Sequence, residues 1–165
     1  MIIAGWAGIG KTTLAKKYKN VIDIESSPYK WDYSGLEPGD YEKMKGRKDR
    51  TPNKDYPLNY IKAIKEAETQ YDVVCVWCHP HNAFPYYEQH GIDYIICYPN
   101  KEAIIEYENR MRERGNSEEF IFGVMNSFEK RCEEFSNNPH TKIILEKGET
   151  LESRLIKMGV KLIEK

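Results

Sequence analysis

Short apolar runs alternate with longer amphipathic segments along the 165-residue chain. An apolar run without internal alternation is typical of a strand covered on both faces, and such runs separated by helical segments are typical of a parallel sheet. We therefore predict an α/β fold with helices on both faces of the sheet. The candidate strands are MIIAG at 1–5, NVIDIE at 20–25, YDVVCVWC at 71–78, IDYIICY at 92–98 and TKIILE at 141–146.

The segments between these runs have the periodicity of amphipathic helices. The predicted helices are 11–19, 57–71, 101–114, one whose cap is Asn116, and one that begins after Thr150. Asn116 with Glu119 three residues later resembles a capping box, and Gly115 can end the preceding helix with a positive φ. Two apolar stripes predict buried helix faces: Leu58, Ile61, Ile64 and Ala67, and then Ile121, Val124, Met125, Phe128, Cys132 and Phe135.

The segment at about 34–56 differs from the rest of the chain. It contains three glycines, two prolines and several basic residues, and it has little apolar periodicity. A polar connection of roughly twenty residues is uncommon in a compact domain and is often functional. We interpret it as a mobile flap over the substrate. The alternative is a surface loop of solvated charges.

Composition narrows the classes of function. The chain has 25 basic and 26 acidic residues, a net charge of −1, which argues against nucleic acid or a membrane surface as the partner. The apolar runs are far shorter than the roughly 20 residues of a membrane span, and MIIAG leads directly into the first motif instead of a signal peptide. The four cysteines lie mostly in apolar stretches. We expect reduced, buried thiols in a single cytoplasmic domain that spans 1–165.

The stretch GWAGIGKTT at 5–13 matches the phosphate-loop pattern G-x-x-x-x-G-K-[ST] at every fixed position. Glycines let successive N–H groups turn toward one anion, and the following helix adds its free N–H groups and dipole. The pattern predicts that Lys11 reaches the β- and γ-phosphates of ATP and that the Thr12 hydroxyl binds Mg²⁺. The predicted nucleotide-binding residues are Gly5, Ala7, Gly8, Ile9, Gly10, Lys11, Thr12 and Thr13.

Acidic residues end the second candidate strand. Asp23 and Glu25 share one side of this strand, and Ser26 follows them. A buried aspartate is costly unless it is paired or coordinates an ion, and ligands of α/β sheets bind beyond the carboxyl ends of strands. Asp23 and Glu25 are candidates for a general base or for ordering magnesium-bound water, with Ser26 beside the acceptor. The alternative is a structural carboxylate that caps backbone N–H groups.

The stretch EYENRMRERGN at 106–116 places Arg110 and Arg114 four residues apart on one helix face. Like charges at this spacing repel unless an anion lies between them, and guanidinium groups suit phosphoryl transfer. We predict both as catalytic arginines. The alternative is pairing within the segment, Arg110 with Glu106 and Arg114 with Glu118.

The string CVWCHPH at 75–81 contains residue types that bind zinc. Cys75 and Cys78 would point to opposite faces of a strand, and no second ligand pair follows. We interpret both cysteines as buried thiols and His79, at the strand end, as a candidate contact to the substrate.

Together, the phosphate loop, the acidic second strand, the 34–56 segment and the arginine-bearing helix resemble P-loop nucleoside and nucleotide kinases. The stretch YPNKEAIIEYENRMRERGN followed by EEFI is most similar to small kinase-like proteins of phages and prophages. The resemblance spans nearly the whole chain. It implies a three-layer P-loop NTPase fold with a five-stranded parallel sheet in the order 2-3-1-4-5, and ATP with Mg²⁺. It also implies an arginine-bearing lid at about 106–118 and a place for adenine beside Lys147 and Gly148.

One position departs from this family, whose third strand often ends in an aspartate, whereas here His79 and Pro80 follow. The resemblance implies that Asp23 substitutes, as the acidic second strand of shikimate-kinase-like enzymes would allow, or that turnover is weak. The predicted function is ATP- and Mg²⁺-dependent transfer of a phosphoryl group to a small acceptor, a nucleoside or nucleoside monophosphate. The alternatives are a regulatory nucleotide-binding module without transfer and a polynucleotide 5′-kinase. The sequence specifies neither the acceptor nor the oligomeric state.

Overall fold

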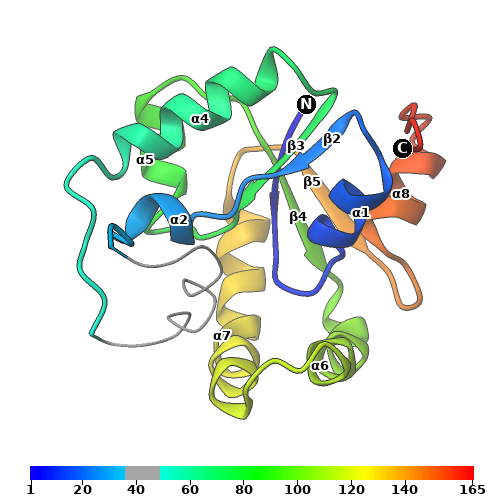
Figure 1. The fold of residues 1–165 in the computed structure, drawn as a ribbon. Coiled ribbons are helices and arrows are strands. Elements are labelled where there is room, and N and C mark those ends of the chain that lie inside the picture. Colours follow the sequence, from blue (N-terminus) through cyan, green and yellow to red (C-terminus); the bar gives the residue numbers. More distant parts are fainter. Residues whose placement is uncertain (36–48) are drawn as a thin grey trace.

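The computed structural model describes residues 1–35 and 49–165, and within these ranges five parallel strands form one sheet (Figure 1). The spatial order is β2-β3-β1-β4-β5. The predicted α/β class and the implied strand order are therefore confirmed. The strands are β1 (Ile2–Gly5), β2 (Val21–Asp23), β3 (Val73–Trp77), β4 (Ile95–Pro99) and β5 (Lys142–Leu145).

Helices cover both faces of the sheet, with α1 and α8 on one side and α4 and α5 on the other (Figure 1). Two of the helices, α2 and α5, were not predicted, because four and six residues are too few to show a periodic pattern. The helices are α1 (Lys11–Lys17), α2 (Ser27–Lys30), α4 (Leu58–Glu68), α5 (Phe84–Gln89), the 3₁₀ turn η1 (Lys101–Ala103), α6 (Ile104–Glu113), α7 (Glu118–Asn137) and α8 (Leu151–Lys157).

The burial of each strand explains its sequence pattern. All four residues of β1 and the first four of β3 are buried, since both lie inside the sheet with helices on either face. The edge strand β5 alternates instead, and Ile144 is exposed. The unalternating runs were therefore a sound guide to the central strands.

Helix α4 is rotated relative to the predicted face. Leu58 is 61% exposed, so its predicted burial is wrong. Tyr60, Ile61, Ile64 and Ala67 form the buried face instead. The aromatic Tyr60 takes the inward position at the start of the helix, where it can fill more space between α4 and the strand ends than Leu58 could.

The ends of α6 and α7 correct one prediction and confirm another. The N-cap of α7 is Ser117, not Asn116, because the extended Ser117 directs its hydroxyl to accept from the N–H of Phe120. Gly115 ends the preceding helix with φ +77°, as predicted. The buried face of α7 is Ile121, Phe128, Cys132 and Phe135.

Most of the predicted 34–56 flap lies at 36–48, outside the described residues, so its role stays a prediction. Its described end is tied to the segment around α2. The N–H of Asp32 donates to the carbonyl of Thr51 at 2.8 Å, and the N–H of Asn53 donates to the carbonyl of Lys30 at 2.9 Å. Within the described ranges, no helix is both long enough and apolar enough to cross a membrane.

Candidate functional site

The predicted phosphate loop connects β1, the central strand, to α1. Gly8 and Gly10 have φ values of +78° and +99°, a region that side chains disfavour, and Gly10 caps α1. The loop therefore has positive φ angles at two of the glycines of the motif, as the glycine pattern predicts. Thr13, predicted as a further phosphate contact, is exposed on the first turn of α1.

Gly5 leaves room for the side chains of Ile9 and Lys11, which pack against it. A Cβ at Gly5 would lie 2.7 Å from Ile9 Cδ1 and 2.8 Å from Lys11 Cδ, too close for either. The Lys11 ammonium group donates to the carbonyls of Gly5 and Trp6, both at 2.9 Å. Lys11 is thus folded across the start of the loop, with its charge at the edge of the sheet.

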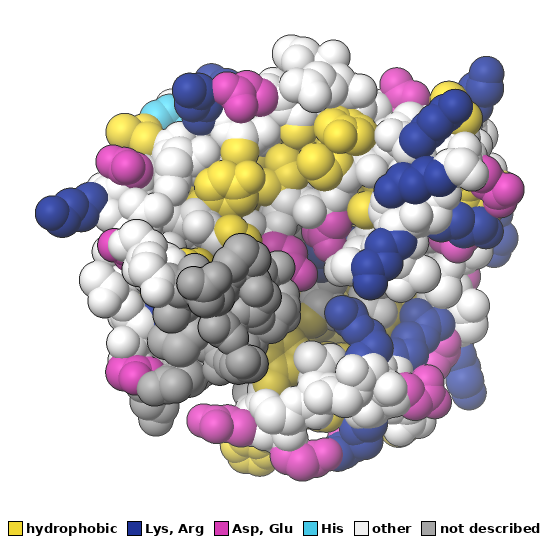
Figure 2. Space-filling view, viewed as in Figure 1, with side chains coloured by type: hydrophobic (Ala, Val, Ile, Leu, Met, Phe, Trp, Pro, Cys, Tyr) yellow, Lys and Arg dark blue, Asp and Glu magenta, His cyan; other side chains and the backbone are white. Residues whose placement is uncertain are grey.

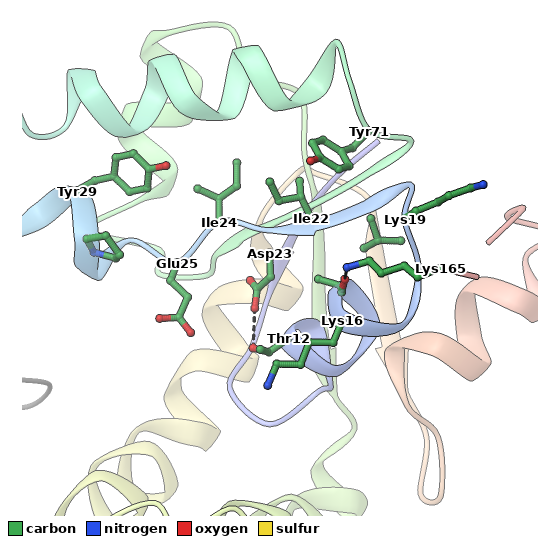
Figure 3. Close-up of a pocket in the computed structure, with 13 residues that line it drawn as sticks. Thr12, Lys16, Lys19, Ile22, Asp23, Ile24, Glu25, Tyr29, Tyr71 and Lys165 are labelled. Carbon is green, nitrogen blue, oxygen red and sulfur yellow. Dashed lines mark hydrogen bonds between the residues drawn. The ribbon is translucent and has the colours of Figure 1, made fainter. Parts of the chain in front are cut away.

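Asp23 lies directly against the phosphate loop. The Thr12 hydroxyl donates to Asp23 Oδ2 at 2.7 Å, and Glu25 points to the same side of the strand while Ile22 and Ile24 point away (Figure 3). The other oxygen, Oδ1, is buried and has no hydrogen-bond partner among the described residues. Burial raises the pKa of Asp23, and the Lys11 charge and the Thr12 hydrogen bond oppose that rise.

Two tyrosines fix the carboxyl ends of β2 and β3 beside this loop. The Tyr60 hydroxyl donates to the carbonyl of Ile24 at 2.9 Å and accepts from the N–H of Trp77 at 2.9 Å. The Tyr87 hydroxyl donates to the carbonyl of Trp77 at 2.8 Å. Since Tyr60 is fully enclosed, these bonds hold Asp23 and Trp77 on rigid strand ends.

A cavity of about 540 Å³ joins these elements, which we call the phosphate-loop cavity. The junction of α6 and α7 forms its far wall through Arg114 and Phe120. The structure therefore brings together most of the predicted site. The predicted residues that line this cavity are Ala7, Gly8, Lys11, Thr12, Asp23, Glu25, Ser26 and Arg114.

Arg110 lies elsewhere. Its guanidinium donates to the carbonyl of Glu149 through both terminal nitrogens at 3.1 Å, pairs with Glu106 and stacks on the Tyr107 ring. The pairing with Glu106 is the alternative that the sequence left open. In the other alternative pair, Glu118 contacts Arg112 instead of Arg114.

His79 does not line the phosphate-loop cavity. It lines a second cavity of about 490 Å³, which we call the α7 cavity and which also contains Trp77. Its Nδ1 accepts from the backbone N–H groups of Asn82 at 3.1 Å and His81 at 3.3 Å. Burial, and then the charge of Arg131, lowers the pKa of His79 to about 4. His79 is therefore neutral at physiological pH, with its proton on Nε2.

A wider groove of about 810 Å³ follows the outer edge of β2 and shares Thr12, Asp23 and Glu25 with the phosphate-loop cavity. Figure 2 shows it as a strip of hydrophobic side chains with basic side chains along one side. The basic residues of the groove are Lys16, Lys19 and Lys165 (Figure 3).

The four cysteines are free and buried, as predicted. Burial raises the pKa of Cys78 to about 12, so this thiol stays protonated. Among the described residues, no group of three or more His, Cys, Asp or Glu side chains is placed to hold a metal ion. A magnesium ion at a phosphate loop does not need such a group, because the nucleotide supplies most of its oxygen ligands.

Searches against family models and curated proteins found no match to this chain. Among solved structures, the tunicamycin resistance protein of Deinococcus radiodurans is similar with a TM-score of 0.53 and 13% identity, over 100% of this chain and 98% of that one. Shikimate kinase from Bacteroides thetaiotaomicron gives a TM-score of 0.49 and 17% identity, over 95% and 94% of the two chains.

The three-layer α/β fold of P-loop proteins is assigned from the strand order and the first of these likenesses. At such low identity the likeness shows the fold alone. The similarity to phage and prophage proteins stays a prediction.

Proposed function

We propose that the protein transfers the γ-phosphoryl group of ATP to a small acceptor, a nucleoside or nucleoside monophosphate. The observation that supports this most is the convergence of Lys11, Thr12, Asp23 and Arg114 on one cavity beyond the carboxyl ends of β1 and β2. This combines an anion site, hard oxygen ligands and a guanidinium group, which phosphoryl transfer requires.

The donor phosphates occupy the loop between Gly5 and Thr12. Backbone N–H groups there and at the start of α1 favour an anion. Lys11 exchanges its two carbonyl partners for phosphate oxygens, which bear more charge. Arg114 approaches from the opposite wall and stabilises the charge that develops on the transferred group.

The residues present fit a magnesium ion. Thr12 and Asp23 offer hydroxyl and carboxylate oxygens, and the buried, unpartnered Asp23 Oδ1 has a coordination site to spare. Thr12 and Asp23 would hold the ion, which supplies neutralisation of charge on the β- and γ-phosphates. Asp23 thus takes the place of the aspartate that β3 lacks.

Asp23 is also the group that receives a proton when the acceptor is a hydroxyl. Asp23 lines the phosphate-loop cavity beside the donor site, where a carboxylate oxygen can accept this proton. The acceptor oxygen bonds to the γ-phosphorus, the bond from that phosphorus to its bridging oxygen breaks, and the electron pair leaves with ADP. Glu25 and Ser26 line the same cavity on the acceptor side.

A nucleotide-binding module without transfer is the second candidate, because His79 and Pro80 stand where kinases of this class often have an aspartate. One assay separates the two. Purified protein is incubated with Mg²⁺ and γ-labelled ATP in parallel with nucleosides, nucleoside monophosphates, small metabolites or 5′-hydroxyl oligonucleotides. We expect label in the nucleoside or nucleoside monophosphate pool. Label released only as phosphate, or retained in ATP, would establish the module instead.

Lys11→Ala is the variant expected to lose activity in this assay. Lys16→Ala is the matched control, because Lys16 is an exposed lysine of the same helix. We expect Lys11→Ala to lower transfer by ~10²–10³-fold, as for loss of one group that stabilises transition-state charge, with an unchanged circular dichroism spectrum. Lys16→Ala should retain most activity. Equal turnover by Lys11→Ala would remove the donor-site assignment.

A further inference from the structure

The α7 cavity adjoins the phosphate-loop cavity but has a different chemistry. It shares Lys11, Trp77 and Phe120 with that cavity, and it lacks Asp23 and Arg114. Its own walls are Trp6, His79 and one face of α7. Lys11 therefore has the proposed donor site on one side and a second cavity on the other.

One ridge of α7 lines this space. Glu119, Gly123, Ser127 and Arg131 follow one another at steps of four residues, so they lie on one line along the helix. Gly123 is unfavourable in a helix interior. A Cβ at Gly123 would meet nothing within 4 Å, so the packing of the protein does not require this glycine. The missing side chain adds open volume to the cavity.

Two nitrogen donors meet at one end of the cavity. Arg131 Nη2 lies 3.4 Å from His79 Nε2, the nitrogen that carries the proton because Nδ1 accepts two backbone N–H groups. The Asn82 side-chain amide lies 3.3 Å from the same nitrogen, and Glu134 accepts from Arg131 Nη1 at 2.7 Å. Arg131 is 17% exposed, so Nη2 and Nε2–H form a sheltered pair of donors that an oxyanion can join.

Both positive and negative charges lie near this pair, and the positive ones have the larger effect on His79. After burial, the charges that lower the pKa of His79 are Arg131, His81 and Lys30, opposed by Glu134. Lys30 Nζ lies 5.1 Å from the centre of the Trp77 ring. Glu119 supplies one negative charge at the cavity, against Lys11 and Arg131. The walls of Trp77 and Phe120 are flat and aromatic, suited to a planar ring.

We propose that the α7 cavity binds one end of the acceptor, where Arg131 and His79 Nε2–H hold an oxyanion, and that the reacting end of the acceptor extends past Lys11 into the phosphate-loop cavity. An acceptor with a phosphate and a planar base, a nucleoside monophosphate, matches both the donors and the aromatic walls. A carboxylate on a small acceptor presents the same charge, and the test below separates the two. The inference rests on the proposed function only in that the acceptor is taken to be phosphorylated.

Binding is measured without ATP by calorimetry and by the fluorescence of Trp6 and Trp77. The probes are the common nucleoside 5′-monophosphates, the matching nucleosides, and quinate as a cyclic hydroxycarboxylate. We expect at least one monophosphate to bind ten-fold or more tightly than its nucleoside. In the wild-type protein the imidazole pKa of His79, followed by NMR, should rise above about 4 when the monophosphate is bound, since an anion offsets the nearby positive charges.

Arg131→Ala should weaken binding of the monophosphate by ~10–100-fold, the range for losing a hydrogen bond to a charged group, and Arg131→Lys should restore part of it. Gly123→Leu should abolish binding by filling the cavity, while Gly123→Ala should raise the melting temperature. Arg112→Ala is the matched control, since Arg112 is exposed and pairs with Glu108 and Glu118. It should leave binding unchanged.

The outcomes separate this inference from the proposed function. Monophosphate binding that depends on Arg131, without any phosphoryl transfer, would support the site and remove the kinase assignment. Transfer to an acceptor whose KM is unchanged in both Arg131→Ala and Gly123→Leu would overturn the site and leave the kinase assignment intact. If quinate alone binds, and its binding depends on Arg131, the acceptor is not a nucleoside monophosphate. The assignment of Arg131 and His79 as an oxyanion site would still hold.

Discussion

At the scale of single residues, Asp23 combines a proposed functional role with a cost in stability. One carboxylate oxygen accepts from Thr12 at 2.7 Å, and the other is buried without a hydrogen-bond partner in the part of the chain that the structure describes. Burial raises the pKa of this group above its ordinary value of 3.8. Above both the folded and the unfolded pKa, the ionised carboxylate therefore destabilises the folded state, because the folded protein binds its proton more tightly than the unfolded chain does.

We predict that Asp23→Asn raises the melting temperature at pH 7, by ~2–4 °C for each kcal/mol of penalty removed, and lowers phosphoryl transfer by ~10²-fold or more. The stabilisation should shrink as pH falls toward 3.8, because the wild-type carboxyl then becomes neutral in the folded protein as well. Thermal melts between pH 4 and pH 8 measure this. A lower melting temperature for Asp23→Asn at pH 7 would contradict it.

At the scale of elements, the α6–α7 junction decides which arginine reaches the phosphate-loop cavity. Arg110 lies within α6 and is drawn to the Glu149 carbonyl and to Glu106. Arg114 is the C-cap of α6 and lines the cavity beside Gly115. Two arginines four residues apart on one helix can place their guanidinium groups in different sites. The side chain is long, and each guanidinium group lies where its own hydrogen-bond partners are.

We therefore predict different effects for the two arginines. Arg114→Ala should lower kcat by ~10²-fold with less than a three-fold change in the KM of ATP, since its charge acts on the transferred group. Arg110→Ala should act on stability, lowering the melting temperature by ~2–4 °C for each kcal/mol lost with the Glu149 contact. Arg112→Ala is the neutral control. Equal losses of kcat in Arg110→Ala and Arg114→Ala would show that both arginines reach the transferred group.

At the scale of the whole molecule, Glu149 connects parts of the chain that are distant in sequence. Its carboxylate pairs with Arg154 and Lys157 of α8 and accepts from the N–H of Glu146. Its backbone carbonyl accepts from Tyr107 and Arg110 of α6. The next-but-one residue, Leu151, donates its N–H to the carbonyl of Ile9 in the phosphate loop at 3.0 Å. The loop after β5 thus ties α6, α8 and the phosphate loop together.

These partners lower the pKa of Glu149 from its ordinary value of 4.5 to about 2, chiefly through Lys157. The stabilisation is therefore present above pH 4.5 and is lost as pH falls toward 2. We predict that Glu149→Gln lowers the free energy of unfolding by ~2 kcal/mol and the melting temperature by ~4–8 °C at pH 7, with a smaller difference near pH 2.5. Glu113→Gln, at an exposed position of α6, is the control and should not change either value.

Several features were predictable because they depend on neighbours in sequence. The strands at the centre of the sheet, the phosphate loop and the side of β2 that carries Asp23 and Glu25 follow from periodicity and from a fixed motif. The short helices α2 and α5, the cap at Ser117 and the exposure of Leu58 were missed. Each of these features depends on how a short stretch of helix packs against residues that are distant in sequence.

The residues of the α7 cavity were missed for a related reason. Arg131 and Gly123 stand in a helix whose apolar stripe is the dominant signal, and Trp77 ends an apolar strand. The spacing of Glu119, Gly123, Ser127 and Arg131 was visible in the sequence, but nothing local showed that this ridge faces His79. Their meeting requires that β3 and α7, about fifty residues apart, pack beside each other.

By itself the sequence determined that this chain is an α/β protein with a phosphate loop after its first strand and carboxylates at the end of its second. Backbone periodicity and short motifs carry that information, since they act over a few residues. Only the tertiary structure decided that Asp23 bonds to Thr12, that Arg114 rather than Arg110 enters the cavity, and that Arg131 meets His79. These contacts join distant segments, and the directions of long side chains follow the partners that packing supplies.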